Sequence, residues 1–167
     1  MEEQSPCLSN SAKIRMIELS SKQKGNLTEL QCITAFYENG CAVSIPYGEN
    51  SRYDFIADVY GKLIRIQVKT SSIKDGNPDA IEFSCRSTRV SATGTFSKRY
   101  TEEEIDYFAT FWNGKCYLVP VNECSVAKTL RFAPPKNGQI KGITFAKDYE
   151  LSKQITKISE KEEVVEH

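Results

Sequence analysis

The fold is decided by the stretch Arg52-Tyr-Asp-Phe-Ile-Ala-Asp-Val-Tyr-Gly-Lys-Leu-Ile-Arg-Ile-Gln-Val-Lys69. Apolar side chains occupy every second position on both sides of its Tyr-Gly-Lys segment, which is the spacing of β-strands with one buried face. The pattern predicts a hairpin with one strand over residues 52–59, a tight turn, and a second strand over residues 63–70.

The hairpin can adopt two registers, because the apolar faces of both strands must pack on the core together. A turn at Tyr60-Gly61 places Asp54 opposite Gln67. A turn at Gly61-Lys62 places Asp54 opposite Lys69 instead. In both registers these side chains project from one face, and opposed residues have Cβ atoms about 5 Å apart. The sequence therefore predicts a compact cluster of a carboxylate, an amide and an ammonium group.

Such a cluster suits the hydrolysis of a phosphodiester. Mg²⁺ prefers oxygen ligands, and Asp54 would supply the anionic one. The side-chain oxygen of Gln67 and the backbone carbonyl of Val68 would add neutral ligands. A bound metal lowers the pKa of a water molecule and offsets charge on the phosphate. Lys69 would orient the attacking water or stabilise the developing charge, and Glu29 would complete the site through a water.

These residues resemble the PD-(D/E)xK nuclease superfamily, and most of all its branch of homing endonucleases associated with group I introns. The segments similar to that branch in order and spacing are Gly25-Asn-Leu-Thr-Glu-Leu, Pro46-Tyr-Gly-Glu-Asn-Ser-Arg-Tyr-Asp-Phe, Gln67-Val-Lys-Thr-Ser, Asp106-Tyr-Phe and Lys115-Cys-Tyr-Leu-Val-Pro. The likeness covers about residues 24–151. It implies a restriction-endonuclease-like mixed β-sheet flanked by helices. The active-site positions of the family fall on Glu29, Asp54, Gln67 and Lys69.

The resemblance also implies a function and partners. It implies Mg²⁺, with Mn²⁺ as an alternative ion, sequence-specific cleavage of double-stranded DNA, and a homo-oligomer, either a dimer or a tetramer. The chain departs from the superfamily pattern at Tyr53, where proline is common, and at Gln67, which replaces the usual acid. Losing this charge weakens metal affinity, so a catalytically weakened DNA-binding module of the same fold is one alternative. A resolvase- or repair-type nuclease that reads DNA structure is another.

The remaining elements predict an α/β or α+β domain with a mixed sheet and at least one covering helix. A helix is expected over residues 27–39, with Asn26 and Glu29 as a capping box and Gly40 at its end. Leu30, Ile33 and Phe36 form its apolar stripe. Further strands are expected over residues 42–45, 80–85, 107–112, 115–119 and 129–132, with Asn113-Gly114 as a hairpin turn.

The charge is evenly balanced but unevenly distributed. Lysine and arginine number 22, as do aspartate and glutamate, yet residues 83–101 and 125–147 contain basic residues and no acid. Basic blocks interleaved with polar side chains suit contacts to DNA phosphates and grooves. The candidate DNA-contacting residues are Arg52, Arg86, Arg89, Lys98, Arg99, Lys128, Arg131, Lys136 and Lys141.

Other features exclude whole classes of chemistry. The six cysteines include no C-x-x-C pair and the only histidine is His167, which argues against structural zinc and against Ser-His-Asp or Cys-His catalysis. The sequence shows no signal peptide and no apolar run long enough to span a membrane, so a cytoplasmic, intracellular protein with reduced thiols is expected. We expect a flexible N-terminal arm (1–24), a PD-(D/E)xK-like nuclease domain (25–151) and a polar acidic C-terminal tail (152–167).

Overall fold

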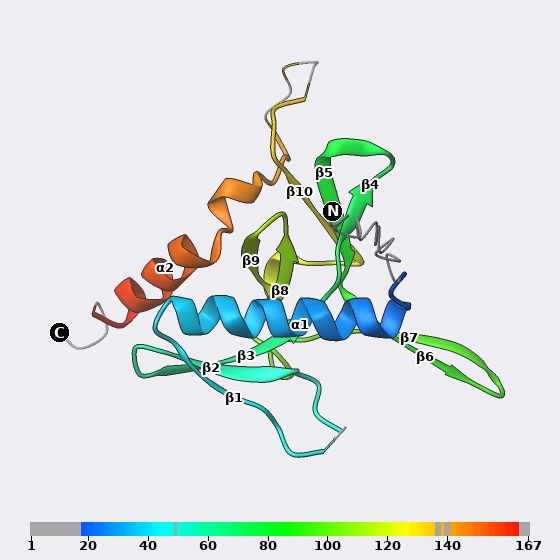
Figure 1. Cartoon of the computed structure of the whole chain (residues 1–167), viewed down its shortest axis with the longest axis horizontal. Coiled ribbons are helices and arrows are strands. Elements are labelled where there is room, and N and C mark those ends of the chain that lie inside the picture. The colour runs from blue at the N-terminus through cyan, green and yellow to red at the C-terminus, as the bar shows by residue number, and fades with distance from the viewer. Residues whose placement is uncertain (1–17, 49, 136–137, 139–140, 164–167) are drawn as a thin grey trace, which may run out of the picture.

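A five-stranded mixed sheet forms the centre of the protein. The computed structural model describes residues 18–48, 50–135, 138 and 141–163. The strand order is β1–β2–β3–β8–β9, and every neighbouring pair is antiparallel except β3 and β8. The bounds are β1 Ala42–Ser44, β2 Phe55–Val59, β3 Lys62–Val68, β8 Tyr107–Trp112 and β9 Lys115–Pro120. Helix α1 (Ser21–Glu38) runs across this sheet (Figure 1). The predicted mixed sheet with a covering helix is confirmed.

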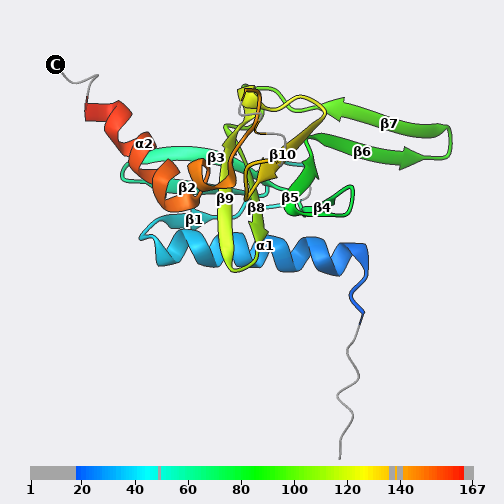
Figure 2. The ribbon, with the colours of Figure 1, turned by 90° about the horizontal axis from the view of Figure 1, so that it is seen from above.

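Two smaller sheets accompany the central one. The first has the order β10–β5–β4, formed by β10 (Ala127–Arg131), β5 (Asn77–Ser84) and β4 (Ser72–Lys74). The second is a hairpin of β6 (Arg86–Ser91) and β7 (Gly94–Arg99), which projects from the body like an arm (Figure 2). We call it the β6–β7 arm. The described residues also form two short 3₁₀ helices, Val121–Glu123 and Ala146–Asp148, and end with helix α2 (Leu151–Glu163).

The core consists of two apolar clusters. One joins α1, the central sheet and α2 through residues such as Phe36, Phe55 and Ile155. The rings of Phe36 and Phe55 meet edge to face with centroids 5.4 Å apart. The other cluster joins β8 and β9 to the smaller sheet through residues such as Phe108 and Phe83. The central sheet is therefore held from both α1 and the β10–β5–β4 sheet.

The hairpin of β2 and β3 adopts the first of the two predicted registers. Phe55 pairs with Ile66 and Val59 pairs with Lys62, so Tyr60 and Gly61 form the turn. Tyr60 and Gly61 have positive φ, 53° and 97°, as the tightest hairpin turns require, and only Gly61 adopts this conformation without a steric cost. The turn at Asn113-Gly114 is also confirmed, since Trp112 pairs with Lys115.

The start of α1 differs from the prediction. The helix begins at Ser21, and its capping box consists of Ser20 and Gln23 rather than Asn26 and Glu29. The side chain of Ser20 accepts a hydrogen bond from the backbone N–H of Gln23, so the same motif occurs earlier in the chain and satisfies the first free donors. Leu30 of the predicted stripe is 62% exposed, because the face around Cys32 and Phe36 packs on the sheet instead. The end of the helix near Gly40 agrees with the prediction.

Both predicted flanking segments need correction where the structure describes them. Residues 21–24 belong to α1, so the expected boundary at residue 24 lies inside a helix. The expected polar tail from residue 152 is largely helix α2, whose Leu151, Ile155 and Ile158 are buried in the core. Their spacing of four and three residues puts them on one helical face, which outweighs the acidic composition of the segment. None of the described helices combines the length and hydropathy needed to cross a bilayer.

The β6–β7 arm was not predicted as a hairpin. Every residue of β7 is exposed, so neither face of this strand packs on a core. A strand with two solvated faces does not show the alternation of apolar and polar residues from which strands are predicted. The segment was visible in the sequence only as a basic block.

Candidate active site

Three groups of β3 contact Asp54, which lies one residue before β2. Its side-chain Oδ2 accepts a hydrogen bond from the Nε2 atom of Gln67 at 2.6 Å and another from the backbone N–H of Val68 at 2.6 Å. The backbone N–H of Asp54 donates to the carbonyl of Ile66 at 2.8 Å. This bond extends the backbone pairing of β2 with β3 by one residue before β2. The hairpin register thus brings the predicted carboxylate and amide into direct contact.

The amide of Gln67 presents its nitrogen, not its oxygen, to this cluster. Besides Asp54, Nε2 lies 3.2 Å from the carbonyl oxygen of Val68. A metal ligand would have to be the Oε1 atom, since an amide nitrogen donates hydrogen bonds and does not bind Mg²⁺. A half-turn of the terminal amide exchanges the two atoms with almost no change of shape. Oε1 of Gln67 and Oδ1 of Asp54 accept no hydrogen bond within the described part of the chain, so both oxygens remain available to a ligand.

Glu29 reaches the same region from α1. It lies more than two turns into the helix, not at its start as expected. The neighbouring residue Thr28 is buried, and its hydroxyl lies 3.3 Å from the hydroxyl of Thr70, just beyond β3. This contact joins the helix to the strand end that carries Lys69. Glu29 is close enough to Asp54 for the two charges to interact.

Lys69 follows β3 directly and is half-buried. Its backbone N–H donates to the carbonyl of Ala109 at 2.9 Å, so the parallel pairing with β8 fixes the backbone at this position. Its Nζ lies 3.4 Å from the hydroxyl of Tyr100 and 5.0 Å from the centre of the Tyr100 ring. The ammonium group is therefore held beside the Asp54 cluster by a residue that the sequence analysis did not identify.

Burial shifts the protonation of all three charged groups. Burial raises the pKa of Asp54 above its usual value, although the N–H of Val68, the charge of Lys69 and the amide of Gln67 act in the opposite direction. Burial and the charge of Asp54 raise the pKa of Glu29. Burial lowers the pKa of Lys69, opposed by Asp54 and assisted by Arg52. Two carboxylates that repel each other in a half-buried place form a site that a cation would stabilise.

The raised pKa of Asp54 predicts a specific pH dependence of stability. Because the folded state binds this proton more tightly than the unfolded chain, the ionised carboxylate destabilises the metal-free protein near neutral pH. Relative to Asp54→Asn, wild type should therefore gain stability as the pH falls from about 7 toward about 4. Denaturant unfolding of both proteins over this pH range measures the difference between their free energies of unfolding. The contributions of the other carboxylates are largely the same in both proteins and cancel in this difference. A difference that is constant with pH would contradict the assigned shift.

The donor set fits a hard divalent cation with few protein ligands. The described residues contain no group of three or more His, Cys, Asp and Glu side chains arranged around one point. At this site an amide, Gln67, stands beside Asp54. Two carboxylates, an amide oxygen and a backbone carbonyl are nevertheless oxygen donors, and Mg²⁺ commonly retains several waters. The residues present therefore fit one such ion.

The predicted basic residues divide into two groups, and the first belongs to the β6–β7 arm. Arg86 and Arg89 lie on β6, and Lys98 and Arg99 lie on β7. Lys98 is mostly exposed and pairs with Glu104 at 2.6 Å. Arg52 lies at the base of the arm, where it donates to Ser87, and so contributes to fixing the arm to the body.

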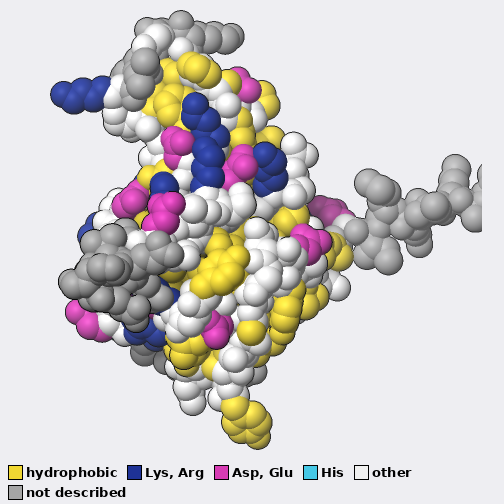
Figure 3. All heavy atoms as spheres, turned by 90° about the vertical axis from the view of Figure 1, so that its left-hand side faces the viewer, with side chains coloured by type: hydrophobic (Ala, Val, Ile, Leu, Met, Phe, Trp, Pro, Cys, Tyr) yellow, Lys and Arg dark blue, Asp and Glu magenta, His cyan; other side chains and the backbone are white. Residues whose placement is uncertain are grey.

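The second basic group lies on and after β10. Lys128 is largely buried and pairs with Glu123 at 3.6 Å, while Nε of Arg131 donates to the carbonyl of Ala133. Lys141 lies in an exposed loop, and Lys136 lies outside the described residues. The face shown in Figure 3 has basic and acidic side chains side by side rather than a continuous basic surface. The arm is thus the stronger candidate for a DNA contact.

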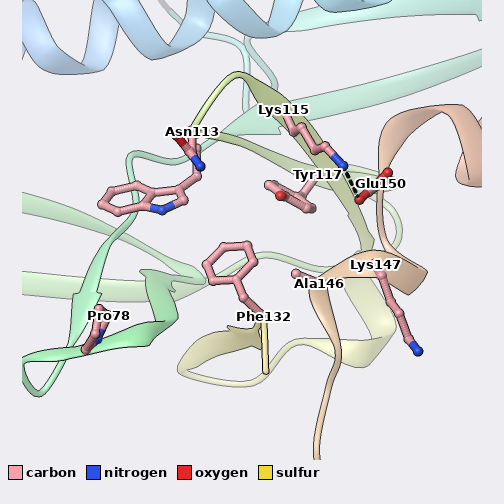
Figure 4. A pocket seen from close by; sticks show the side chains of 9 residues that line it. Pro78, Asn113, Lys115, Tyr117, Phe132, Ala146, Lys147 and Glu150 are labelled. Atoms are coloured by element: carbon pink, nitrogen blue, oxygen red, sulfur yellow. Dashed lines mark hydrogen bonds and ion pairs between the residues drawn. The ribbon is translucent and has the colours of Figure 1, made fainter. Parts of the chain in front are cut away.

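A recess of about 400 Å³ lies elsewhere on the surface and contains none of the four candidate catalytic residues. Its walls include Trp112, Tyr117 and Phe132, and an ion pair between Lys115 and Glu150 at 2.8 Å stands at its edge (Figure 4). The Asp54 cluster, by contrast, lies at strand ends next to the arm.

A mixed sheet with a carboxylate, an amide and a lysine at one end of a β-hairpin is the arrangement that the sequence analysis associated with nucleases. The chain belongs to the PD-(D/E)XK endonuclease family, whose family profile matches residues 19–152. Membership implies that the chain is a nuclease and therefore a hydrolase. Members of this family generally use a divalent metal.

A solved structure supports the fold assignment. The chain is similar to the structure titled as that of a bacterial homing endonuclease, I-Ssp6803I, with a TM-score of 0.71 and 20% identity. The match covers 89% of this chain and 99% of the other. The restriction-endonuclease-like fold expected from the sequence is therefore confirmed. A comparison with curated protein sequences finds no match.

Proposed function

We propose that this chain is an Mg²⁺-dependent endonuclease that cuts double-stranded DNA at specific sequences, in the manner of a homing endonuclease. The observation that carries the proposal is the convergence of Asp54, Gln67 and the backbone of Val68, with Lys69 and Glu29 beside them, in a member of an endonuclease family. The similarity to a bacterial homing endonuclease supports the finer part of the proposal.

Each residue of the site has a role in this proposal. Asp54 and Glu29 would hold the cation, together with the side-chain oxygen of Gln67 and the backbone carbonyl of Val68. When bound, the cation makes a water molecule more acidic and offsets charge on the phosphate. Lys69 orients the attacking water or stabilises charge on the phosphate oxygens, because its ammonium group is held in a half-buried place near Asp54.

The deciding assay compares wild type, Lys69→Ala and Lys62→Ala on plasmid and genomic DNA with Mg²⁺ or Mn²⁺. Lys62 lies at the other end of β3, beside the hairpin turn, and serves as a matched control. We expect wild type and Lys62→Ala to cut and Lys69→Ala to lose most of its activity. Equal cutting by all three proteins would refute the assigned site. Wild type is also tested on a library of randomised DNA sequences with the same metal ions. If it cuts no member of this library and neither of the other substrates, the endonuclease proposal is rejected.

A catalytically weakened DNA-binding module is the second candidate, and one observation favours it. The nitrogen of the Gln67 amide faces Asp54 in the structure, so a ligand oxygen is turned away from the carboxylate. Calorimetric titration with Mn²⁺ separates the two functions. Uptake of the metal by wild type favours the enzyme, whereas DNA binding without metal uptake favours the module.

We further propose that DNA contacts the β6–β7 arm. The arm projects from the body and carries basic side chains along both strands, which suits phosphate contacts and entry of a two-stranded ribbon into the major groove. The double variant Lys98→Ala with Arg99→Ala should reduce the slope of log affinity against log salt concentration by about two. Fluorescence anisotropy at several salt concentrations measures this slope.

The matched control for the arm is the double variant Lys153→Ala with Lys157→Ala. It removes the same charge from exposed positions of α2. We expect this control to leave the salt slope near the wild-type value. An equal loss in both double variants would show that the net charge, and not the arm, determines DNA affinity.

We also propose that the active enzyme is a homo-oligomer, either a dimer or a tetramer. The described part of the chain offers one candidate site, and cutting both strands of a duplex calls for two. Exposed apolar side chains on α1, among them Leu27, Leu30 and Tyr37, support a surface that another copy could cover. Sedimentation with and without target DNA measures the oligomeric state, and a monomer under both conditions would contradict the proposal.

A further inference from the structure

Tyr100 occupies the junction between the β6–β7 arm and the central sheet. It follows the last residue of β7 and is half-buried. Its ring meets the ring of Phe108 on β8 edge to face, with centroids 5.4 Å apart and an interplanar angle of 88°. Phe108 is only 1% exposed, so the ring of Tyr100 rests on a rigid part of the core.

Two cations contact the ring of Tyr100. The guanidinium carbon of Arg52 lies 4.1 Å from its centre, and Nζ of Lys69 lies 5.0 Å from it. The Arg52 distance is typical of a cation over an aromatic face, whereas the Lys69 ammonium lies toward the hydroxyl end of the ring. The hydroxyl of Tyr100 is 3.4 Å from Nζ of Lys69, so the same side chain offers this lysine two interactions.

Arg52 in turn joins this ring to the arm. Its guanidinium group donates to the hydroxyl of Ser87 on β6 at 2.9 Å and to the carbonyl of Arg99 on β7 at 3.3 Å. Its Nε lies 3.1 Å from a carboxylate oxygen of Glu104. The side chain of Arg52 therefore bridges both strands of the arm and the ring that contacts Lys69.

We propose that Tyr100 is a positioning residue that holds the ammonium group of Lys69 in the active site and connects it, through Arg52, to the β6–β7 arm. This inference rests on the proposed role of Lys69 in phosphodiester hydrolysis and deepens it. A lysine side chain has four rotatable bonds, so without a contact to its ammonium group it would spend much of its time in other rotamers. The ring restricts Lys69 to the orientation that faces Asp54.

The first test measures the position of Lys69 without using activity. In protein labelled with ¹³C-lysine, the Cε protons of Lys69 should show a ring-current shift caused by Tyr100, with the signal assigned through Lys69→Arg. The shift should remain in Tyr100→Phe, which keeps the ring, and vanish in Tyr100→Leu. The absence of a ring-current shift in wild type would overturn the proposal.

A matched control is available at Tyr149. Its ring lies 5.2 Å from Nζ of Lys128, so it presents the same kind of cation contact at another place. Tyr149→Leu should move the Lys128 signal and leave the Lys69 signal unchanged. If Tyr149→Leu moves the Lys69 signal as much as Tyr100→Leu does, the effect comes from general loosening of the fold and the proposal fails.

The second test separates chemistry from DNA binding. Tyr100→Leu should lower the single-turnover cleavage rate by about tenfold or more, whereas DNA affinity measured without a divalent metal should change by less than about threefold. Tyr100→Phe should recover most of the rate. A Tyr100→Leu variant that cuts at the wild-type rate would overturn the proposal, as would an equal loss of rate and affinity.

The two tests also distinguish this inference from the proposed function. If wild type cuts no DNA but Lys69 shows the ring-current shift that Tyr100→Leu removes, the nuclease assignment fails while the contact is real. If wild type cuts DNA but the shift is absent, the nuclease assignment stands and the role of Tyr100 is rejected.

Discussion

Replacing Asp54 by asparagine should reduce Mg²⁺-dependent cleavage of double-stranded DNA by about a thousandfold or more, because stabilisation of transition-state charge by a metal amounts to several kcal/mol. Asp54 supplies the carboxylate at the point where the amide of Gln67 and the backbone of Val68 meet. Asparagine has nearly the same shape but no charge, so the hydrogen bonds of the site can persist while cation binding is lost. Single-turnover cleavage and calorimetry with Mn²⁺ measure the two effects.

The same substitution should leave the protein folded or make the metal-free protein slightly more stable. Burial raises the pKa of this carboxyl, which means that its charge is unfavourable in the folded state at neutral pH. Thermal unfolding without metal checks this expectation. A large loss of stability would mean that Asp54 acts mainly in folding. The loss of cleavage in Asp54→Asn would then be explained by unfolding and not by removal of a metal ligand.

Asp58→Asn is the matched control for this experiment. Asp58 lies on the same strand, and its carboxylate accepts a hydrogen bond from the backbone N–H of Gly61 in the hairpin turn at 2.7 Å. It should retain cleavage and metal binding within a few-fold of wild type. If Asp58→Asn loses as much activity as Asp54→Asn, the loss reflects disturbance of the hairpin and not removal of a metal ligand.

The second large effect is expected at Ile155→Ala on α2, which should lower the free energy of unfolding by about 2–5 kcal/mol. Ile155 is 5% exposed and belongs to the cluster that also contains Phe36 and Phe55. Truncation leaves a cavity beneath the central sheet, because the surrounding strands can collapse only in part. This loss is a large fraction of the stability of a typical domain, about 5–15 kcal/mol. Denaturant unfolding followed by circular dichroism measures it.

Thr156→Ala provides the comparison on the same helix turn. Thr156 is exposed, and its hydroxyl donates to the carbonyl of Ser152 within the helix. We expect a change within about 0.5 kcal/mol, as for most surface positions. A small effect at Ile155, similar to that at Thr156, would mean that α2 does not dock as described and that the segment behaves as the polar tail first expected.

The glutamine at position 67 has a consequence for metal binding. An acid there would place a third carboxylate beside Glu29 and Asp54, where burial and mutual repulsion already raise the pKa of both acids. Glutamine keeps an oxygen donor at the site and adds no further repulsion to the metal-free protein. The expected result is a site for one cation that binds more weakly than a site with three carboxylates.

Local patterns in the chain were sufficient to predict the core of the site. Alternation of apolar residues in β2 and β3 required Asp54 and Gln67 to share a face, and the two possible turns differed only in the exact partner of Asp54. The turn at Asn113-Gly114 followed from its own composition. These features depend on neighbours a few residues apart, and short-range preferences therefore predict them well.

Long-range packing decided the rest. Glu29 meets the Asp54 region because α1 lies across the sheet, and Tyr100 reaches Lys69 because the arm returns beside β8. The docking of α2 depends on an apolar face on a helix whose composition is mostly charged and polar. A periodic pattern identifies which face of an element is buried, but it carries no information about which distant element will cover that face. For this reason the cluster on the hairpin was predictable, whereas the residues that complete and support it became visible only in the assembled fold.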